Sequence, residues 1–237
     1  MNVFAIILVA SVLTPQPGFE KDGYNWMARH RHILAEQTKI NPEIVMIGDS
    51  ITHNWAGRQK DCIGGTDALP HWKKTFEGRR VLNMGFGFDR ICNVMWRLEN
   101  GELKGTDPEY VVIHVGGNNF IGSKKYKADK PEEVAEGVVK IAEKVHEIVP
   151  KAKIVVMAIF PFGYTPGERC RVGIAAANKE LAKKIAALKY VTYLDITSKQ
   201  LRADGIYPGE LTKDSIHPTE KGYDIWSAAL KPILKLK

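Results

Sequence analysis

Five short apolar runs, rich in β-branched side chains, constrain the fold of this 237-residue chain more than any other feature. They cover residues 43–47, 80–83, 110–115, 153–160 and 190–196. Segments with apolar residues at helical spacing separate them, at 24–38, 70–76, 89–99, 131–148, 172–188 and 218–234. Buried parallel strands have this near-continuous apolar character, and helices cover both faces of such a sheet. The sequence therefore predicts an α/β fold, a three-layer α/β/α sandwich around a five-stranded parallel sheet in the flavodoxin-like order 2-1-3-4-5.

The chain divides into a short N-terminal segment and one predicted domain. Residues 20–237 have the length and the apolar content of a single α/β domain. Residues 1–19 indicate a signal peptide or an N-terminal extension, because Met1 to Leu13 carries an apolar run too short to span a membrane. No Lys or Arg precedes that run, and Ala10 is the best candidate for a cleavage position. We expect a secreted or periplasmic protein, with a cytoplasmic location as the alternative.

Charge and cysteine content exclude several classes of function. The formal net charge of +7 is spread over helical segments without a dense Lys/Arg run, so we expect a solvated surface and no nucleic-acid partner. The three cysteines, Cys62, Cys92 and Cys170, form no CxxC pair. We expect reduced thiols with Cys92 buried on a helix, and one disulfide stays open. No HExxH or comparable spacing is present, so we expect no metal site. No apolar run after the N-terminal one reaches the length of a membrane span.

The residues that carry chemistry follow the predicted strands. Gly-Asp-Ser at 48–50 comes after the first, Asn-Met-Gly-Phe-Gly at 83–87 after the second, and Gly-Gly-Asn-Asn at 116–119 after the third. Asp-Ser-Ile-His at 214–217 lies in the last loop, after the fifth. In open parallel sheets ligands bind outside the carboxyl ends of the strands. We therefore expect these four segments to meet at one edge of the sheet.

The residue types in these segments are those of nucleophilic catalysis. A serine hydroxyl needs a base to take its proton, and a histidine base needs a group that fixes its tautomer. Ser50, His217 and Asp214 are the candidate nucleophile, base and acid. The negative charge that develops on the substrate oxygen needs donors. The backbone N–H groups of Ser50 and Gly85 and the side-chain amide of Asn118 are the candidates.

Each segment also has a structural interpretation when taken alone. Gly-Asp-Ser makes an ordinary turn after a strand, and the glycines of 85–87 allow tight strand–helix packing. A dinucleotide fingerprint is excluded because Arg90 stands where GxGxxG needs glycine. Asp214 with His217 can be a helix cap. Four such segments in this order, each after a strand, favour the catalytic interpretation.

Other histidines compete for the role of base. His114 lies inside an apolar strand and is predicted to be a core residue. His53 follows Ser50 by three residues and is predicted to be a surface neighbour of the site. The remaining ones lie on helix-like segments with no carboxylate at matching spacing: His30, His32, His71 and His146.

With these residues in place, the chain resembles the SGNH subgroup of GDSL hydrolases from about Tyr24 to Leu234. The four letters stand for a serine, a glycine, an asparagine and a histidine, here Ser50, Gly85, Asn118 and His217, and Asp214 falls at the position of the family's acid. The resemblance makes residues 20–237 an SGNH/GDSL hydrolase domain. It implies a two-step acyl transfer through an acyl-serine, with no cofactor.

Within the family, residues 81–119 resemble the catalytic subunits of platelet-activating-factor acetylhydrolase and the bacterial acyl esterases similar to them. Two positions depart from the family pattern. Phe88 stands where a second glycine is frequent, and Gly117 stands where threonine is frequent. Neither replaces a catalytic group, but Phe88 is expected to narrow or reshape the entrance to the site.

The resemblance implies short acyl esters, chiefly acetyl, as substrates, with a small molecule or a carbohydrate as the alcohol. Aromatic residues in the expected strand-end loops either wall a substrate pocket or cover the sheet: Trp55, Phe86, Phe88, Phe120, Phe160, Phe162 and Tyr164. The candidate pocket residues are Asp49, Phe86, Phe88, Asn119, Phe120 and Phe162. A lysophospholipase or thioesterase acting on longer chains stays open. So does a non-catalytic binding or assembly module of the same fold, and the resemblance leaves a homodimer open.

Overall fold

The sheet at the centre of the molecule has the predicted strand order. The computed structural model describes residues 12–18, 24–56, 68–122 and 127–236. Five parallel strands pair in the order β2-β1-β3-β4-β5. Their bounds are β1 Ile44–Gly48, β2 Val81–Gly85, β3 Tyr110–His114, β4 Lys153–Met157 and β5 Val191–Leu194. This confirms the flavodoxin-like α/β prediction.

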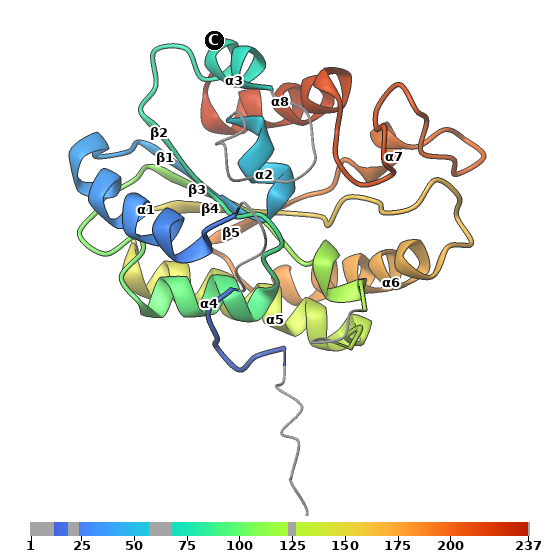
Figure 1. Cartoon of the computed structure of the whole chain (residues 1–237), viewed down its shortest axis with the longest axis horizontal. Helices are drawn as coiled ribbons and strands as arrows, with labels where there is room; N and C mark the ends of the chain where they lie inside the picture. The colour runs from blue at the N-terminus through green and yellow to red at the C-terminus, as the bar shows by residue number, and fades with distance from the viewer. Residues whose placement is uncertain (1–11, 19–23, 57–67, 123–126, 237) are drawn as a thin grey trace, which may run out of the picture.

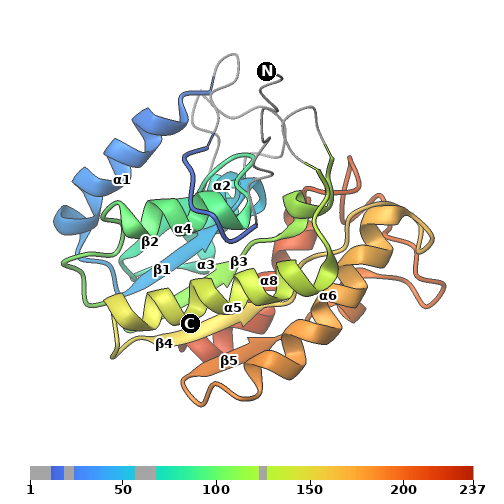
Figure 2. The same cartoon turned by 90° about the horizontal axis from the view of Figure 1, so that it is seen from below.

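Helices cover both faces of the sheet. Their bounds are α1 Trp26–Ile40, α2 Ser50–Trp55, α3 Leu69–Thr75, α4 Ile91–Glu99, α5 Pro131–Ile148, α6 Arg169–Ile185, α7 Thr197–Gln200 and α8 Glu220–Leu234. A 3₁₀ turn, η1, spans Gly117–Phe120. In Figure 1, α2, α3 and α8 lie above the sheet, and α4, α5 and α6 lie below it. Figure 2 shows α4, α5 and α6 from below, with α1 beside the β2 edge.

Helix α5 illustrates why these residues form these elements. Pro131 occupies its first turn, where the missing N–H costs no hydrogen bond. Glu132 and Glu133 in that turn interact favourably with the positive end of the helix dipole. The residues at helical spacing are buried against the sheet, Val134, Val138, Ile141 and Val145 among them. The burial of this apolar face holds the helix in the lower layer.

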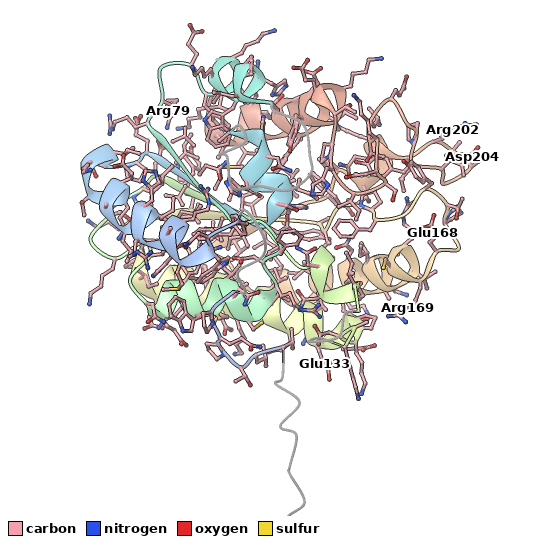
Figure 3. All side chains as sticks on the ribbon, in the orientation of Figure 1. Arg79, Glu133, Glu168, Arg169, Arg202 and Asp204 are labelled. Carbon is pink, nitrogen blue, oxygen red and sulfur yellow. The ribbon has the colours of Figure 1, made fainter. Side chains whose placement is uncertain are left out.

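Charged side chains lie at the surface, as the charge distribution predicts. Several lysines of α5 and α6 pair with glutamates one turn away: Lys140 with Glu143 and Lys183 with Glu180. Figure 3 shows Glu168 and Arg169 at the start of α6, and Arg202 with Asp204 in the loop after α7, at the periphery of the fold. Exposed pairs of this kind contribute little to stability.

The clearest differences from the sequence-based expectation are in α2, α7 and β4, and β5 also ends earlier, at Leu194 and not at residue 196. Helices α2 and α7 were not expected, because both are a few residues long and polar. Helix α2 forms because Asp49 accepts a hydrogen bond from the backbone N–H of Ile51 and caps its first turn. The fourth strand ends at Met157 and not at Phe160, because Asn178 of α6 bonds both the N–H and the carbonyl of Ile159 and ends the ladder there.

The described part of the N-terminal segment packs on α4. Val12 is buried, the N–H of Gln16 donates to the carbonyl of Cys92, and Asn93 donates to the carbonyl of Gln16. Residues 1–11, which hold most of the predicted signal sequence, lie outside the described residues. None of the helices that the structure describes is long and apolar enough to cross a membrane. Cys92 is a buried free thiol and Cys170 is a half-buried one, whereas Cys62 lies outside the described residues.

Candidate active site

Ser50 is held at the junction of β1 and α2. Strand β1 ends at Gly48, where a Cβ would lie 2.1 Å from Thr52 Oγ1 and 2.5 Å from the carbonyl oxygen of His114. A glycine is therefore required for the sharp turn into α2. Asp49 caps that helix, and Ser50 is its first residue, half-buried at the carboxyl end of the sheet.

His217 and Asp214 lie next to Ser50, from the opposite end of the chain. Ser50 Oγ is 2.8 Å from His217 Nε2, and His217 Nδ1 is 2.6 Å from Asp214 Oδ2. The hydroxyl and the carboxylate thus occupy the two nitrogens of one imidazole ring. This is the geometry in which a histidine takes a proton from a serine while a carboxylate stabilises the ring.

The loop that carries the acid and the base is rigidly held. Asp214 Oδ1 accepts from the backbone N–H groups of Ile216, at 3.0 Å, and of His217, at 2.7 Å. Ser215 between them adopts a left-handed backbone conformation with φ of 65°. Thr212 donates from Oγ1 to the carbonyl of His217 at 2.9 Å. Thr212 is a positioning contact that the sequence analysis missed, because its only signal is proximity to Asp214.

Hydrogen bonding keeps the Asp214 carboxylate ionised. Partial burial alone would raise the pKa of Asp214. The side-chain and backbone hydrogen bonds from His217, the charge of His217 and the N–H of Ile216 outweigh burial and hold this pKa well below its usual range. Asp214 therefore remains a negative partner for the imidazole wherever an ordinary histidine titrates.

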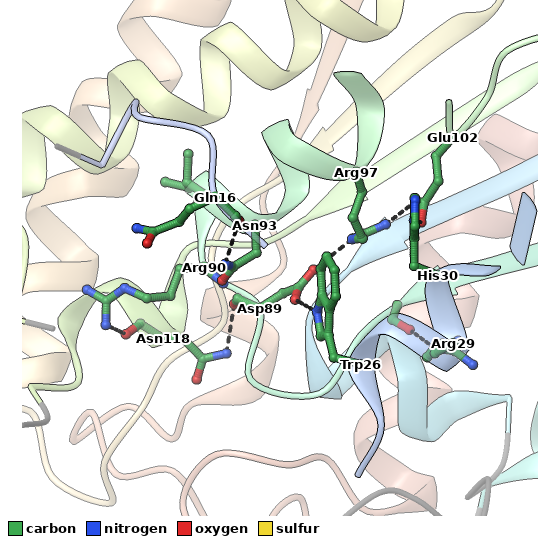
Figure 4. A network of polar contacts seen from close by, with 12 residues as sticks. Gln16, Trp26, Arg29, His30, Asp89, Arg90, Asn93, Arg97, Glu102 and Asn118 are labelled. Carbon is green, nitrogen blue, oxygen red and sulfur yellow. Dashed lines mark hydrogen bonds and ion pairs between the residues drawn. The ribbon is translucent and has the colours of Figure 1, made fainter. Parts of the chain in front are cut away.

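Of the three expected oxyanion donors, Ser50 and Asn118 each keep an N–H hydrogen available for a substrate oxygen. The Ser50 N–H stands at the first turn of α2. Asn118, in η1, donates one hydrogen of its side-chain amide to the carbonyl of Asp89 at 2.9 Å, and a primary amide carries a second hydrogen. Figure 4 shows Asn118 beside Asp89.

The expectation for Gly85 is wrong in this structure. Its N–H donates to Asn83 Oδ1 at 2.9 Å, so that donor is engaged inside the fold. A Cβ on Gly85 would lie 2.3 Å from the backbone nitrogen of His53. Gly85 is therefore required for close packing of α2 on β2, which was the structural interpretation of this glycine segment.

Phe88, like Ser215, has a left-handed backbone conformation. It is the third residue of the turn Phe86–Asp89, in which the Asp89 N–H donates to the carbonyl of Phe86, and its φ is 65°. Glycine is favoured at this position of a turn, and a left-handed conformation costs a larger residue about 1–2 kcal/mol. Strain of this kind clusters at functional sites. The half-buried Phe88 ring lies 6.3 Å from the ring of Tyr24.

Most of the other candidate pocket residues do not line an open pocket. Phe86 is fully buried between the guanidinium groups of Arg29 and Arg97. Asn119 is fully buried, where it accepts from the N–H of Ile91 and donates to Asp129. These two predictions are wrong, because sequence spacing does not reveal which way a side chain turns at the end of a strand.

Aromatic residues of the strand-end loops mainly cover the sheet. Phe120 is buried against Gly173, and Phe162 is buried against Gly117. Trp55 and Phe160 are fully buried as well. Among the seven aromatics considered, Phe88 is half-buried and Tyr164 is exposed, so the others fill the core.

Histidines other than His217 contact residues of the fold outside the candidate site. His114 is buried as predicted and accepts from the N–H of Phe160 at 3.3 Å. The surface prediction for His53 is wrong, because His53 is buried, and burial lowers the pKa of its ring well below the usual range. His30 and His71 do have carboxylate partners, Glu102 and Asp224, which lie far away along the chain.

Asp49 is a buried carboxyl group beside the nucleophile. It is 1% exposed, and its Oδ2 has no hydrogen-bond partner among the residues that the structure describes. Burial raises the pKa of Asp49 to about 6, against the N–H of Ile51 and the charge of His217. The carboxyl therefore takes up a proton in the folded protein at a higher pH than in the unfolded chain.

This difference predicts a pH-dependent effect of Asp49→Asn. The folded state binds the proton more tightly, so Asp49 stabilises the wild type below pH 3.8 and loses this contribution as pH rises to about 6. From about pH 4 to pH 7 the free energy of unfolding of the wild type should fall by about 2 kcal/mol more than that of the variant. Urea unfolding at both pH values measures the difference. Parallel pH dependence in the two proteins would contradict it.

Arg90 is a second residue that the sequence analysis missed. It stands at the N-cap of α4, where its positive charge is unfavourable next to the positive end of the helix dipole. A charge at this unfavourable position was the sequence signal that Arg90 has another role. Its guanidinium group donates to the carbonyls of Asn118, Asn119 and Ile121 in the η1 loop and forms an ion pair with Asp129 at 2.7 Å. Arg90 thereby holds the loop that carries the Asn118 amide.

Comparisons with known proteins show the family of this chain. The model of the GDSL-like lipase/acylhydrolase family matches residues 46–225. The chain is 30% identical over 229 residues to platelet-activating factor acetylhydrolase IB subunit alpha1 of Homo sapiens, covering 95% of this chain and 89% of that protein. It is 30% identical over 198 residues to subunit alpha2 of Rattus norvegicus, covering 84% and 78%.

A solved structure has the same fold. A GDSL-like lipase from Bacteroides thetaiotaomicron superposes with a TM-score of 0.68 at 19% identity, over 88% of this chain and 98% of that chain. At this identity the superposition concerns the fold alone.

Proposed function

This chain belongs to the GDSL-like lipase/acylhydrolase family, and from that premise we propose that it is a serine esterase that cleaves short-chain esters through an acyl-enzyme. The observation that carries the proposal is the 2.8 Å contact between Ser50 Oγ and His217 Nε2, with Asp214 on the other ring nitrogen. A serine with this contact has a base in place for its proton.

The proposed reaction has two halves. Ser50 Oγ attacks the ester carbonyl while its proton passes to His217 Nε2, and the charged ring is stabilised by Asp214. His217 then gives this proton to the departing alkoxide, so that the alcohol leaves and an acyl-serine remains. Water enters, loses a proton to His217 and attacks the acyl carbon. The carboxylic acid departs and Ser50 recovers its proton.

The negative charge on the tetrahedral intermediate needs fixed donors. The Ser50 N–H and the second hydrogen of the Asn118 amide are the donors that we propose. Both are attached to backbone held by other contacts: Ser50 by the Asp49 cap and Asn118 by Arg90. Fixed donors stabilise charge without reorganisation at the moment of reaction, which makes them effective in catalysis.

Replacing Asn118 with alanine should lower kcat about 10²–10³-fold, because one oxyanion donor is removed. KM should change little, since the donor acts in the transition state more than in the bound ester. Steady-state kinetics on p-nitrophenyl acetate measure both constants. A change confined to KM would contradict the assignment of Asn118 as a donor.

For the substrate, we propose acetyl and other short acyl esters, including those of carbohydrates. The support is the similarity to proteins named platelet-activating factor acetylhydrolase, whose name specifies an acetyl ester. The alcohol has no comparable support from the site, because most aromatic residues near it are buried.

A chain-length series tests the substrate proposal. p-Nitrophenyl esters of two to twelve carbons and an acetylated sugar should be compared at equal concentration, with Ser50→Ala as the baseline for uncatalysed hydrolysis. We expect kcat/KM to be highest for acetyl and to fall by at least about tenfold at long chains. A maximum at long chains would favour a lysophospholipase or thioesterase, and no turnover of any ester would favour a binding module.

A further inference from the structure

Two neighbouring residues hold Asn118 at both of its ends. The Asn118 side-chain amide donates to the backbone carbonyl of Asp89 at 2.9 Å, and the Asn118 backbone carbonyl accepts from Arg90 Nη1 at 2.8 Å (Figure 4). Asp89 and Arg90 join the turn after β2 to the start of α4. The expected oxyanion donor, which follows β3, is thus attached to the segment that follows β2 as well as to its own loop.

The Asp89 side chain is itself anchored in the core. It is 1% exposed, its Oδ1 accepts from Trp26 Nε1 at 2.6 Å, and its Oδ2 accepts from Arg97 Nε at 2.9 Å. Two bonds from two different helices fix this carboxylate, and with it the direction of the Asp89 carbonyl that Asn118 uses. Trp26 and Arg97 meet Asp89 from α1 and α4.

Arg97 has a further partner behind it. The side chains of Arg97 and Glu102 are fully buried and form an ion pair, and Glu102 Oε1 lies 2.9 Å from His30 Nδ1. The Arg97 guanidinium also lies 4.0 Å from the ring centroid of Phe86. This network therefore runs from the Asn118 amide to α1 and to the far end of α4, as Figure 4 shows.

Stability alone does not account for this network. Taking charges out of water costs several kcal/mol each, and well-packed apolar residues in place of a buried ion pair are often neutral or stabilising. Burial raises the pKa of Asp89 to about 7, against the opposing effects of Arg97 and of the Trp26 hydrogen bond. In some proteins a buried charged network fixes one conformation, and the network here ends at the contact between Asp89 and Asn118.

We propose that Asp89 and Arg90 are positioning residues that orient the Asn118 amide toward the oxyanion, with Trp26 and Arg97 fixing Asp89. The proposal rests on the esterase function proposed above. A primary amide is planar, so a bond from one of its hydrogens to the Asp89 carbonyl fixes the direction of the other. Arg90 fixes the backbone from which the amide extends. Misplacement of a catalytic group by about 1 Å can cost about 10²-fold in rate.

A double-mutant cycle tests the proposal. Arg90→Lys removes the planar guanidinium group that donates to several carbonyls of the η1 loop. Asp89→Asn removes the negative charge of the carboxylate that accepts from Trp26 and Arg97. We expect each to lower kcat at least about tenfold with KM nearly unchanged. In the Asn118→Ala background each should lower kcat less than about twofold, because the group that they position is gone. Arg90→Lys keeps a positive charge and is the milder variant. It therefore tests the proposal even if Asp89→Asn impairs folding.

The chain offers a matched control in Arg171. This arginine is also buried, and it donates to the carbonyls of Phe162, Gly163 and Gly205 without touching Asn118. Arg171→Lys should change kcat by the same factor whether residue 118 is asparagine or alanine. All values are taken per active site, counted by complete labelling with a fluorophosphonate.

The outcomes separate the two proposals. If Asn118→Ala lowers kcat and the Asp89 and Arg90 variants lower it by equal factors in both backgrounds, the positioning role is overturned while the esterase stands. Wild-type kcat in both Arg90→Lys and Asp89→Asn overturns it too. If Ser50→Ala and Asn118→Ala both retain wild-type kcat, the esterase proposal fails, and the positioning role fails with it.

Discussion

Replacing Ser50 with alanine is expected to lower kcat for p-nitrophenyl acetate by about 10⁴–10⁶-fold, to the level left by binding and the oxyanion donors. The loss is large because no other group can form the acyl intermediate. Ser50 Oγ contacts the His217 ring at the half-buried start of α2, so its removal leaves the core intact. Circular dichroism and thermal unfolding should match those of the wild type.

Ser227 provides the control for this variant. It lies buried on α8, where its hydroxyl donates to the carbonyl of Asp224 in its own helix. Ser227→Ala should retain kcat within about twofold, because this hydroxyl bonds only within its own helix and has no part in the reaction. Activity of Ser50→Ala within tenfold of the wild type would refute the nucleophile assignment.

Replacing Asp214 with asparagine is expected to lower kcat by about 10⁴-fold. Asn keeps an oxygen that can accept from the N–H groups of Ile216 and His217, so the loop should hold its shape. Its amide, however, carries no charge to stabilise the imidazolium, and it donates to a ring nitrogen that should itself donate. The wrong tautomer of His217 then faces Ser50.

Kinetics of single and double variants check this role. Because Ser50, His217 and Asp214 act as one unit, Ser50→Ala with Asp214→Asn should be no slower than Ser50→Ala alone. Additive losses would mean that Asp214 acts elsewhere. A loss below tenfold in Asp214→Asn would contradict its role as partner of His217.

The fold was largely predictable because its strands are buried on both faces. Residues such as those of 44–47 are apolar at every position, and this pattern excludes a half-exposed strand. The bounds were less accurate where a tertiary contact ends an element. Asn178, on α6, bonds the backbone of Ile159 and ends β4 there. No local sequence signal near Ile159 reveals this contact.

The site was predictable to the extent that it depends on residue type at strand ends. Ser50, Asp214 and His217 meet because their segments follow strands of one sheet. Side-chain direction was not predictable: Phe86 turns into the core between two arginines. Nor were contacts that join distant segments, such as Arg90 with the carbonyls of the Asn118 loop.

Labelling with a fluorophosphonate tests the central claim most directly, since this reagent phosphonylates a serine only where a base activates it. After reaction, digestion and mass spectrometry identify the modified residue. We predict one label per chain, on Ser50, with hydrolysis of p-nitrophenyl acetate lost in proportion to labelling. A label on another residue, or full ester hydrolysis by a protein that takes up no label, would contradict the account.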